Sequence, residues 1–209
     1  MTFKTKKSAY NFKNCISPII LMSPHAGTNY SKHLMSQTNL SLKELRASED
    51  FYINTIIGTK QNKCTVLSAN FPRVFIDVNR SPLDIDPDML KINKLNEIFF
   101  KDSPKVISGI GVFHRVSFNG HIIYPYKLSI NEARQRLFKY YFPYHRKIKE
   151  IIKNKKKLFK KILAFDLHSM ASKIVPDDVD IVLSNDDNKT CDNKTMIIVN
   201  SKKIVLNND

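Results

Sequence analysis

The sequence predicts an α/β fold with three αβα layers around a mixed, largely parallel sheet. Three observations predict it. Short apolar runs alternate with segments of helical spacing, no internal repeat is present, and 209 residues are enough for one sizeable core. We therefore expect a single domain over residues 1–209. No stretch approaches 18 consecutive apolar residues, so no membrane span is expected.

The predicted strands are short, branched apolar runs bounded by polar or turn-forming residues. A hairpin is predicted within Val112–Tyr124, because Asn119-Gly120 is the strongest short hairpin signal in the chain. The predicted strands are Pro18–Met22, Thr65–Leu67, Val74–Val78, Lys161–Leu167 and Asp180–Leu183, with a last one at Met196–Val199 and Ile204–Leu206.

Three segments are predicted to be helical. Ser48–Gly58 begins with a capping residue and ends with a glycine, and Met89–Phe100 has helical spacing. A capping-box pattern at Ser129 precedes the apolar stripe of Ile130–Ile151. Pro143 interrupts that stripe, so we expect it to kink or split the helix.

The net charge of +15 is carried mainly by Lys, which supplies 27 of the 34 cations. Nine cations and one acid lie between Arg146 and Lys161. This run is either a solvated surface or a patch that binds polyanions. Base readout favours Arg over Lys, so we do not expect nucleic acid as a partner, and a basic nucleic-acid-binding domain is kept only as an alternative.

The three cysteines form no paired framework and no CxxC motif, which suits a reducing cytoplasm. The N-terminus is basic, but the apolar run Ile16–Met22 that follows it is too short for a signal peptide. We therefore expect a cytoplasmic protein.

Two histidines, His25 and His168, each follow a predicted strand, where α/β sheets bind their ligands. Structural histidines are the alternative. A carboxylate from Glu49 or Asp50 would complete a His/His/carboxylate set, which is the pattern of catalytic zinc with an open position. Asp166 lies two residues before His168 and would orient its ring.

A strand at Val74–Val78 would deliver Asn79 and Arg80 to the same edge of the sheet, where Arg suits bidentate capture of a carboxylate. The alternative is a structural ion pair between Arg80 and one of Asp77, Asp84 or Asp86. Arg115 follows Gly109-Ile110-Gly111 and could bring a cation to a site. His145 lies at the expected kink, where helix packing is the alternative to a site role.

These pieces occur in an order that resembles the N-formylglutamate amidohydrolase family over residues 17–191. The family is similar in fold to the zinc carboxypeptidases (phosphorylase/hydrolase-like). The stretches that carry the resemblance are Ser23-Pro-His-Ala-Gly27, Ser48-Glu-Asp50, Arg73-Val-Phe-Ile-Asp-Val-Asn-Arg-Ser-Pro82, Gly109-Ile-Gly-Val-Phe-His-Arg115, Tyr141-Phe-Pro-Tyr-His145 and Asp166-Leu-His-Ser-Met170.

The resemblance implies hydrolysis of an N-formyl or similar N-acyl amino acid, such as N-formyl-L-glutamate, at one Zn²⁺ per chain. It implies that His25 and His168 are metal ligands, with Asp50 as the acidic ligand and Glu49 as the fallback. Arg80, together with Asn79, would hold the α-carboxylate of the small-molecule substrate. The predicted catalytic residues are Arg115, at the oxyanion, and His145, as a substitute base.

One feature departs from the family pattern. Family members continue through further helix and strand to a late Glu that acts as the general base, whereas here no Glu follows Glu150. We therefore expect a C-terminally truncated domain. Two functions stay open: a zinc-dependent N-acyl amino acid hydrolase, or a catalytically impaired relative that retains metal or carboxylate binding.

Overall fold

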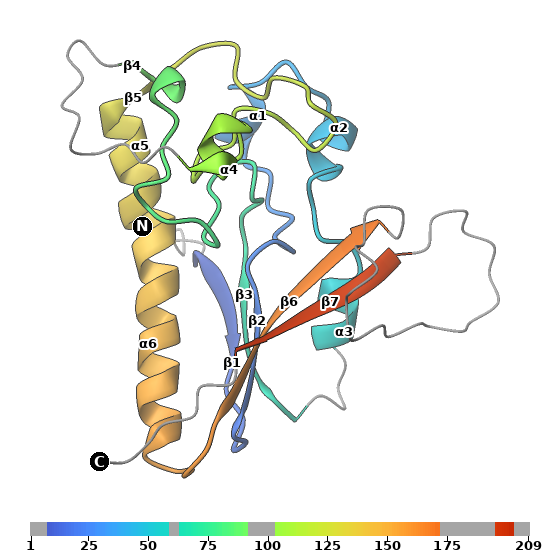
Figure 1. Ribbon diagram of the computed structural model, residues 1–209, viewed down its shortest axis with the longest axis vertical. Helices are drawn as coiled ribbons and strands as arrows, with labels where there is room; N and C mark the ends of the chain where they lie inside the picture. Colours follow the sequence, from blue (N-terminus) through green and yellow to red (C-terminus); the bar gives the residue numbers. More distant parts are fainter. Residues whose placement is uncertain (1–7, 59–62, 92–102, 172–194, 203–209) are drawn as a thin grey trace, which may run out of the picture.

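A five-stranded mixed sheet forms the centre of the molecule (Figure 1). In spatial order its strands are β1 (Tyr10–Lys13), β3 (Thr65–Ala69), β2 (Ile19–Ser23), β6 (Leu163–Ala171) and β7 (Thr195–Lys202). Strands β3, β2 and β6 are parallel, while β1 and β7 pair antiparallel at the two edges. The predicted α/β fold with a mixed sheet is confirmed. The computed structural model describes residues 8–58, 63–91, 103–171 and 195–202.

The register of the parallel strands brings distant segments to one edge of the sheet. Met22 of β2 lies opposite Leu67 of β3 on one side and opposite Asp166 of β6 on the other. The chain that follows β2 and the second half of β6 therefore lie close together, although they are about 140 residues apart in sequence.

Helices cover both faces of the sheet. Helix α6 (Phe142–Lys156) lies on one face and α3 (Ile53–Ile57) on the other (Figure 1). Because side chains alternate along a strand, successive residues of one strand join different apolar clusters. The α6 face buries Ile20, Leu67, Ala164, Tyr144 and Ile151, and the α3 face buries Val66, Leu167, Ile53 and Ile57.

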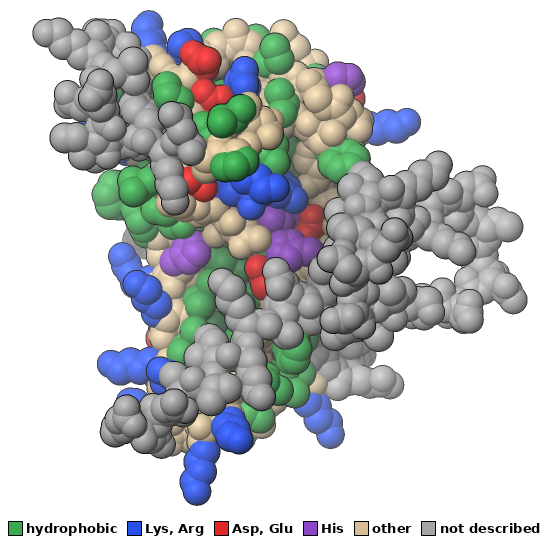
Figure 2. Space-filling model, viewed as in Figure 1, with side chains coloured by type: hydrophobic (Ala, Val, Ile, Leu, Met, Phe, Trp, Pro, Cys, Tyr) green, Lys and Arg blue, Asp and Glu red, His purple; other side chains and the backbone are tan. Residues whose placement is uncertain are grey.

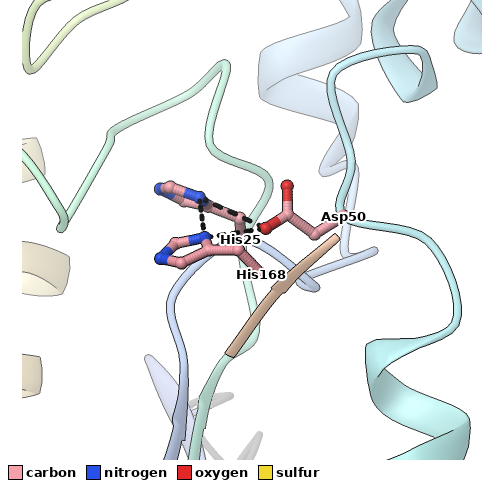
Figure 3. Close-up of side chains that lie close together, drawn as sticks. All are labelled: His25, Asp50 and His168. Carbon is pink, nitrogen blue, oxygen red and sulfur yellow. Dashed lines mark hydrogen bonds and ion pairs between the residues drawn. The ribbon is translucent and has the colours of Figure 1, made fainter. Parts of the chain in front are cut away.

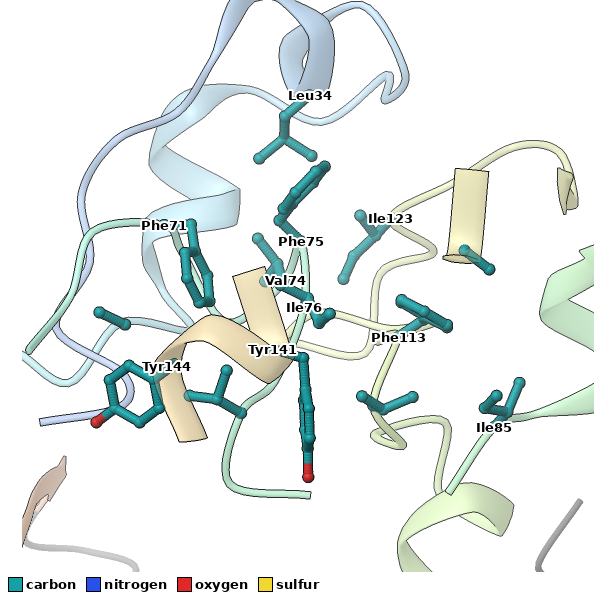
Figure 4. Packing of buried hydrophobic residues seen from close by; sticks show 14 of the residues in the cluster. Leu34, Phe71, Val74, Phe75, Ile76, Ile85, Phe113, Ile123, Tyr141 and Tyr144 are labelled. Atoms are coloured by element: carbon teal, nitrogen blue, oxygen red, sulfur yellow. The ribbon is translucent and has the colours of Figure 1, made fainter. Parts of the chain in front are cut away.

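The larger cluster continues above the sheet into the segment around Val74–Val78 (Figure 4). There Val74, Phe75, Ile76 and Tyr141 are all buried, and the ring of Phe75 packs edge-on against Tyr140. This packing fixes the segment that carries Asn79 and Arg80 against the start of α6.

The helix predicted behind Ser129 is split, as Pro143 led us to expect. Helix α5 (Ile130–Arg136) is followed by a π-helical turn (Leu137–Tyr141) and then by α6. The Phe142 N–H donates to the carbonyl of Leu137, five residues back, just before the proline. Since Pro143 has no N–H for the next bond, a wider turn at this point removes the conflict.

The remaining elements are short. They are α1 (Lys32–Met35), α2 (Leu42–Arg46), α4 (Pro104–Ile107), a 3₁₀ turn (Pro87–Met89), and the two-residue strands β4 (Leu90–Lys91) and β5 (Leu128–Ser129), which pair in parallel. Serine caps begin α1, α2, α4 and α5. None of the described helices is long and apolar enough to cross a membrane.

One predicted strand is wrong, and one predicted helix forms only in its second half, where it ends beside Gly58 as expected. Val74–Val78 is a buried irregular segment rather than a strand, because Phe75 closes a turn onto Pro72 and Asp77 N–H donates to the carbonyl of Val112. The helix expected from Ser48 begins only at Ile53, since Tyr52 adopts a left-handed conformation with φ of 66°. The Ser48 hydroxyl accepts instead from the N–H of Phe118.

The other predicted elements are met only in part. The turn at Asn119-Gly120 forms, with Gly120 at φ of 79°. The segments on its two sides pair only through one isolated β-bridge, between Val116 and Ile122, and not as strands. Met89 closes the 3₁₀ turn instead of opening a helix, and residues 92–100 lie outside the described part, as do 180–183 and 204–206. The predicted run 196–199 falls within β7.

Candidate metal centre

His25, Asp50 and His168 converge at the upper edge of the sheet (Figure 3). His25 lies two residues after β2, and Asp50 lies in the loop between α2 and α3. The Asp50 N–H donates to the carbonyl of His25 at 3.2 Å, which ties this loop to the end of β2. His168 lies within β6 and not after it, because pairing with β7 extends this strand to Ala171.

Three atoms of these side chains form a small triangle (Figure 3). Nδ1 of His25 lies 3.2 Å from Nδ1 of His168, and Oδ2 of Asp50 lies 3.6 and 2.9 Å from these two nitrogens. Ligand atoms about 2.1 Å from one tetrahedral zinc ion lie roughly 3.4 Å apart, so the triangle has suitable dimensions. The predicted convergence is observed, while metal binding by these residues stays a prediction.

The outward-facing nitrogen of each histidine meets a carboxylate. Nε2 of His25 lies 2.8 Å from Oδ1 of Asp77, and Nε2 of His168 lies 3.2 Å from Oδ2 of Asp166, the partner expected from the sequence. A histidine that donates from Nε2 to a carboxylate turns Nδ1 to the opposite side, where its lone pair can bind a metal once Nδ1 carries no proton. Both rings are thus oriented as metal ligands require.

Asp77 is the main residue of this site that the sequence did not predict as such; the sequence offers it only as a structural ion-pair partner of Arg80. Its side chain is completely buried. Besides His25, it accepts from Arg73 at 3.1 Å, from His114 at 3.1 Å and from the backbone N–H of Asn79 at 2.8 Å. The signal was an acid inside an apolar run, because a buried carboxylate needs charged or hydrogen-bonded partners.

Charged and hydrogen-bonding groups around the triangle keep the carboxylates of Asp50 and Asp77 ionised. Burial acts to raise the pKa of Asp50, but hydrogen bonds from His168 and His25 and the nearby Arg73 lower it well below its ordinary value. Burial likewise fails to raise the pKa of Asp77, which His25, Arg73 and His114 hold low. For His168, hydrogen bonds to Asp166 and Asp50 outweigh burial and raise the pKa to about 9.

The negative charge around the triangle also favours the binding of a cation. Three carboxylates, those of Asp50, Asp77 and Asp166, contact the two histidines, and Arg73 is the cation that contacts two of them, at 3.5 Å from Asp50 and 3.1 Å from Asp77. In the space-filling view, histidine and acidic side chains gather near the middle of the displayed face, beside a group of basic side chains (Figure 2). The residues present therefore fit a divalent ion such as Zn²⁺.

The predicted substrate-binding pair lies beside the triangle. Nδ2 of Asn79 is 3.3 Å from Nε2 of His168. Arg80 donates from Nε to the carbonyl of Ile110 at 3.1 Å and from Nη1 to the carbonyl of Asn79, and its Nε lies 4.0 Å from Oδ2 of Asp77. Among the described residues Nη2 has no hydrogen-bond partner. The alternative of a structural ion pair thus applies only to the long contact with Asp77.

Three predicted site residues are not brought to the triangle. Arg115 pairs with Asp86 at 2.9 Å, whereas its neighbour His114 contacts Asp77. Glu49, the fallback ligand, pairs with Arg46 at 3.2 Å.

His145 is the third. It donates from Nε2 to the carbonyl of Val78 at 2.8 Å, and burial lowers its pKa. The ring therefore contacts the backbone beside Asn79 instead of the triangle.

Comparisons with known proteins identify similar folds and a family. Among solved structures, the chain is similar to an N-formylglutamate amidohydrolase from Ralstonia eutropha, with 28% identity and a TM-score of 0.69 over 78% of this chain and 58% of that one. A gene product from Agrobacterium tumefaciens, 19% identical with a TM-score of 0.53, shares the fold over 72% of this chain and 52% of its own. No curated protein matches.

The chain thus spans less than two thirds of the length of either solved structure. A family model described as N-formylglutamate amidohydrolase matches residues 17–202, which is most of the 209-residue sequence. The chain belongs to the N-formylglutamate amidohydrolase family.

Proposed function

We propose that this chain hydrolyses the N-formyl amide of an amino acid such as N-formyl-L-glutamate, releasing formate and the free amino acid. One observation carries the proposal: His25, Asp50 and His168 present three ligand atoms at the spacing of a tetrahedral zinc site. The family and its Ralstonia eutropha member support the reaction class. We also propose that the fold of this chain is like that of the zinc carboxypeptidases.

In this proposal His25, Asp50 and His168 hold Zn²⁺. When bound, the ion supplies a Lewis acid that activates water and polarises a carbonyl group. Asp77 and Asp166 keep the two rings turned so that Nδ1 faces the ion. By accepting hydrogen bonds from Nε2, these carboxylates keep the proton of each histidine on the nitrogen that faces away from the ion.

Asn79 and Arg80 hold the α-carboxylate of the substrate. Two N–H groups of the Arg80 guanidinium are already bound to the carbonyls of Ile110 and Asn79, which fixes its plane and leaves the Nη2 edge for a ligand. A guanidinium held in this way loses little side-chain entropy when it binds a carboxylate. Arg115 is left out of the proposal, because Asp86 already pairs with it.

A second candidate function is metal and carboxylate binding with impaired hydrolysis. It is favoured by the state of the carboxylates in the described part of the site, since those of Asp50, Asp77 and Asp166 all accept from partners. His145 is poorly placed to act as the base, because its ring contacts the carbonyl of Val78 instead of the triangle, and burial lowers its pKa. A missing base would cost about 10²–10⁴-fold in rate.

Formate release distinguishes the two candidates. The chain is stripped with a chelator, reloaded with Zn²⁺ and supplied with N-formyl-L-glutamate, and the Ralstonia eutropha protein is assayed in parallel. Turnover comparable to that protein supports the first candidate. A chain that binds Zn²⁺ but turns over at least about 10²-fold more slowly supports the second. A chain that binds no Zn²⁺ contradicts both.

A further inference from the structure

The two carbonyl groups that flank Asn79 in the chain are both bound by side chains from the start of α6. The Tyr141 hydroxyl donates to the carbonyl of Arg80 at 2.7 Å, and Nε2 of His145 donates to the carbonyl of Val78 at 2.8 Å. The two rings pack on each other, with centroids 4.4 Å apart and planes 35° apart. Burial raises the pKa of Tyr141 to about 12, so its hydroxyl remains a donor at neutral pH.

The π-helical turn explains why both side chains reach this segment. Tyr141 is its last residue, and His145 follows four residues later on the same side of the helix. The extra residue in a π turn rotates the following helix by about 100° relative to a continuous α-helix. Without it, α6 would present another face to the Val78–Arg80 segment. Such turns are frequent at functional sites.

The amide groups of the same segment are held from the opposite direction. Asn79 N–H donates to Oδ1 of Asp77 at 2.8 Å, and Arg80 N–H donates to the backbone carbonyl of Asp77 at 3.3 Å. Oδ1 of Asp77 also lies 2.8 Å from Nε2 of His25. The backbone around Asn79 is therefore held between a residue that orients a candidate ligand and two side chains from one helix.

We propose that Tyr141 and His145 are positioning residues that hold the Val78–Arg80 backbone in the shape that binds the substrate carboxylate. This inference rests on the proposed function, which assigns Asn79 and Arg80 to that carboxylate. Neither ring touches the reacting atoms. They orient the side-chain amide of Asn79 and the guanidinium of Arg80. Their loss should therefore weaken substrate binding and leave zinc affinity unchanged.

The test uses the zinc-loaded full chain with single substitutions. Tyr141→Phe and His145→Phe keep an aromatic ring but remove the donor, while His145→Gln restores an N–H group near the place of Nε2. We expect the two Phe variants to raise KM for N-formyl-L-glutamate about five- to tenfold, as the loss of one hydrogen bond does, with kcat within about twofold and zinc affinity unchanged. His145→Gln recovers most of the loss.

A matched control is Tyr144→Phe. Tyr144 lies on the same helix and is buried, but its hydroxyl has no hydrogen-bond partner among the described residues, so its removal should leave KM unchanged. Equal effects of Tyr141→Phe and Tyr144→Phe, or a His145→Gln variant no better than His145→Phe, would overturn the proposal.

A second measurement does not depend on turnover. Hydrogen exchange at the amides of Asn79 and Arg80 should be faster in Tyr141→Phe and His145→Phe than in the parent or in Tyr144→Phe. Unchanged exchange rejects the positioning role even if the parent is inactive. Absence of formate release from the parent, with faster exchange in the two variants, rejects the proposed hydrolysis and keeps the role of the helix.

Discussion

Two buried charged residues each bind a network of polar groups, and both networks hold the segment 73–80. In the Asp77 network, a completely buried carboxylate accepts from His25, Arg73, His114 and the N–H of Asn79. In the Arg136 network, a guanidinium that is 2% exposed donates to the carbonyl of Phe75, the hydroxyl of Tyr124, Gln37 and Glu132.

The two networks differ in whether they include a candidate site residue. The Arg136 network contains no candidate site residue, and its guanidinium also lies 4.1 Å from the ring centroid of Phe75. The Asp77 network includes His25, whose other nitrogen faces the candidate metal position. One buried charge thus serves packing alone, while the other couples packing to the orientation of a candidate ligand. Burial and partner number alone do not separate these two roles.

The largest effect is expected from Arg136→Met, which keeps much of the side-chain volume but removes the charge and every donor. Glu132, Gln37, Tyr124 and the Phe75 carbonyl then each lose the hydrogen bond from Arg136, which should lower the free energy of unfolding by about 3 kcal/mol. Urea unfolding measures this loss. Zinc affinity of the folded variant should match that of the parent.

Arg134→Met is the matched control, because Arg134 lies in the same helix and is exposed. It should change the free energy of unfolding by less than about 0.5 kcal/mol. A folded Arg136→Met variant with weakened zinc binding would show that the Arg136 network also serves the site, so that the two networks would not differ in role.

Asp77→Asn should affect zinc binding directly. The amide can still accept from Nε2 of His25, but the negative charge that holds this ring and its proton is lost. Loss of such an outer carboxylate weakens metal affinity by about 10- to 100-fold. Competition with a chromophoric chelator measures it. Asp88→Asn, at an exposed carboxylate beside Lys127, should leave zinc affinity unchanged; equal affinities in the Asp77 variant and the parent would refute the role given to Asp77.

The sequence predicted the parts of this site that depend on local pattern. Strand β2 and most of β6 were visible as apolar branched runs, and the polar residues at their ends led to His25 and His168. The split at Pro143 followed from the missing N–H of proline. The choice of Asp50 over Glu49 came from the family resemblance and agrees with the geometry.

What the sequence could not give were contacts set by tertiary packing. Val74–Val78 is apolar because the segment is buried, and burial alone does not distinguish a strand from an irregular chain. Arg115 and His114 are neighbours, and only the local backbone decides which of them turns inward to Asp77. Gln37 and Arg136 lie 99 residues apart, so no pattern along the chain joins them.

The smallest expected effect concerns Glu132 and depends on pH. Burial acts to raise the pKa of this carboxyl, but hydrogen bonds from Gln37 and Arg136 lower it below 4.5. A group whose pKa is lower in the folded state stabilises the protein above its unfolded pKa. That stability is lost as the pH falls through the folded pKa. Glu132 should therefore stabilise the metal-free chain at neutral pH and lose this effect as the pH falls from the ordinary Glu pKa through its lowered folded pKa.

Glu132→Gln isolates this contribution, because Gln keeps the length of the side chain and one acceptor oxygen for Arg136 but has no charge to titrate. At pH 7 the variant should be less stable than the parent by about 1–2 kcal/mol, the value of a hydrogen bond to a charged group. The difference should shrink toward zero as the pH is lowered through the folded pKa of Glu132, since the parent becomes neutral at this position too. Urea unfolding of both chains in chelator, at a series of pH values, measures it. A difference that stays constant with pH would mean that Glu132 contributes through packing and not through its charge, so that the Arg136 network would be held by neutral hydrogen bonds while the Asp77 network depends on charge.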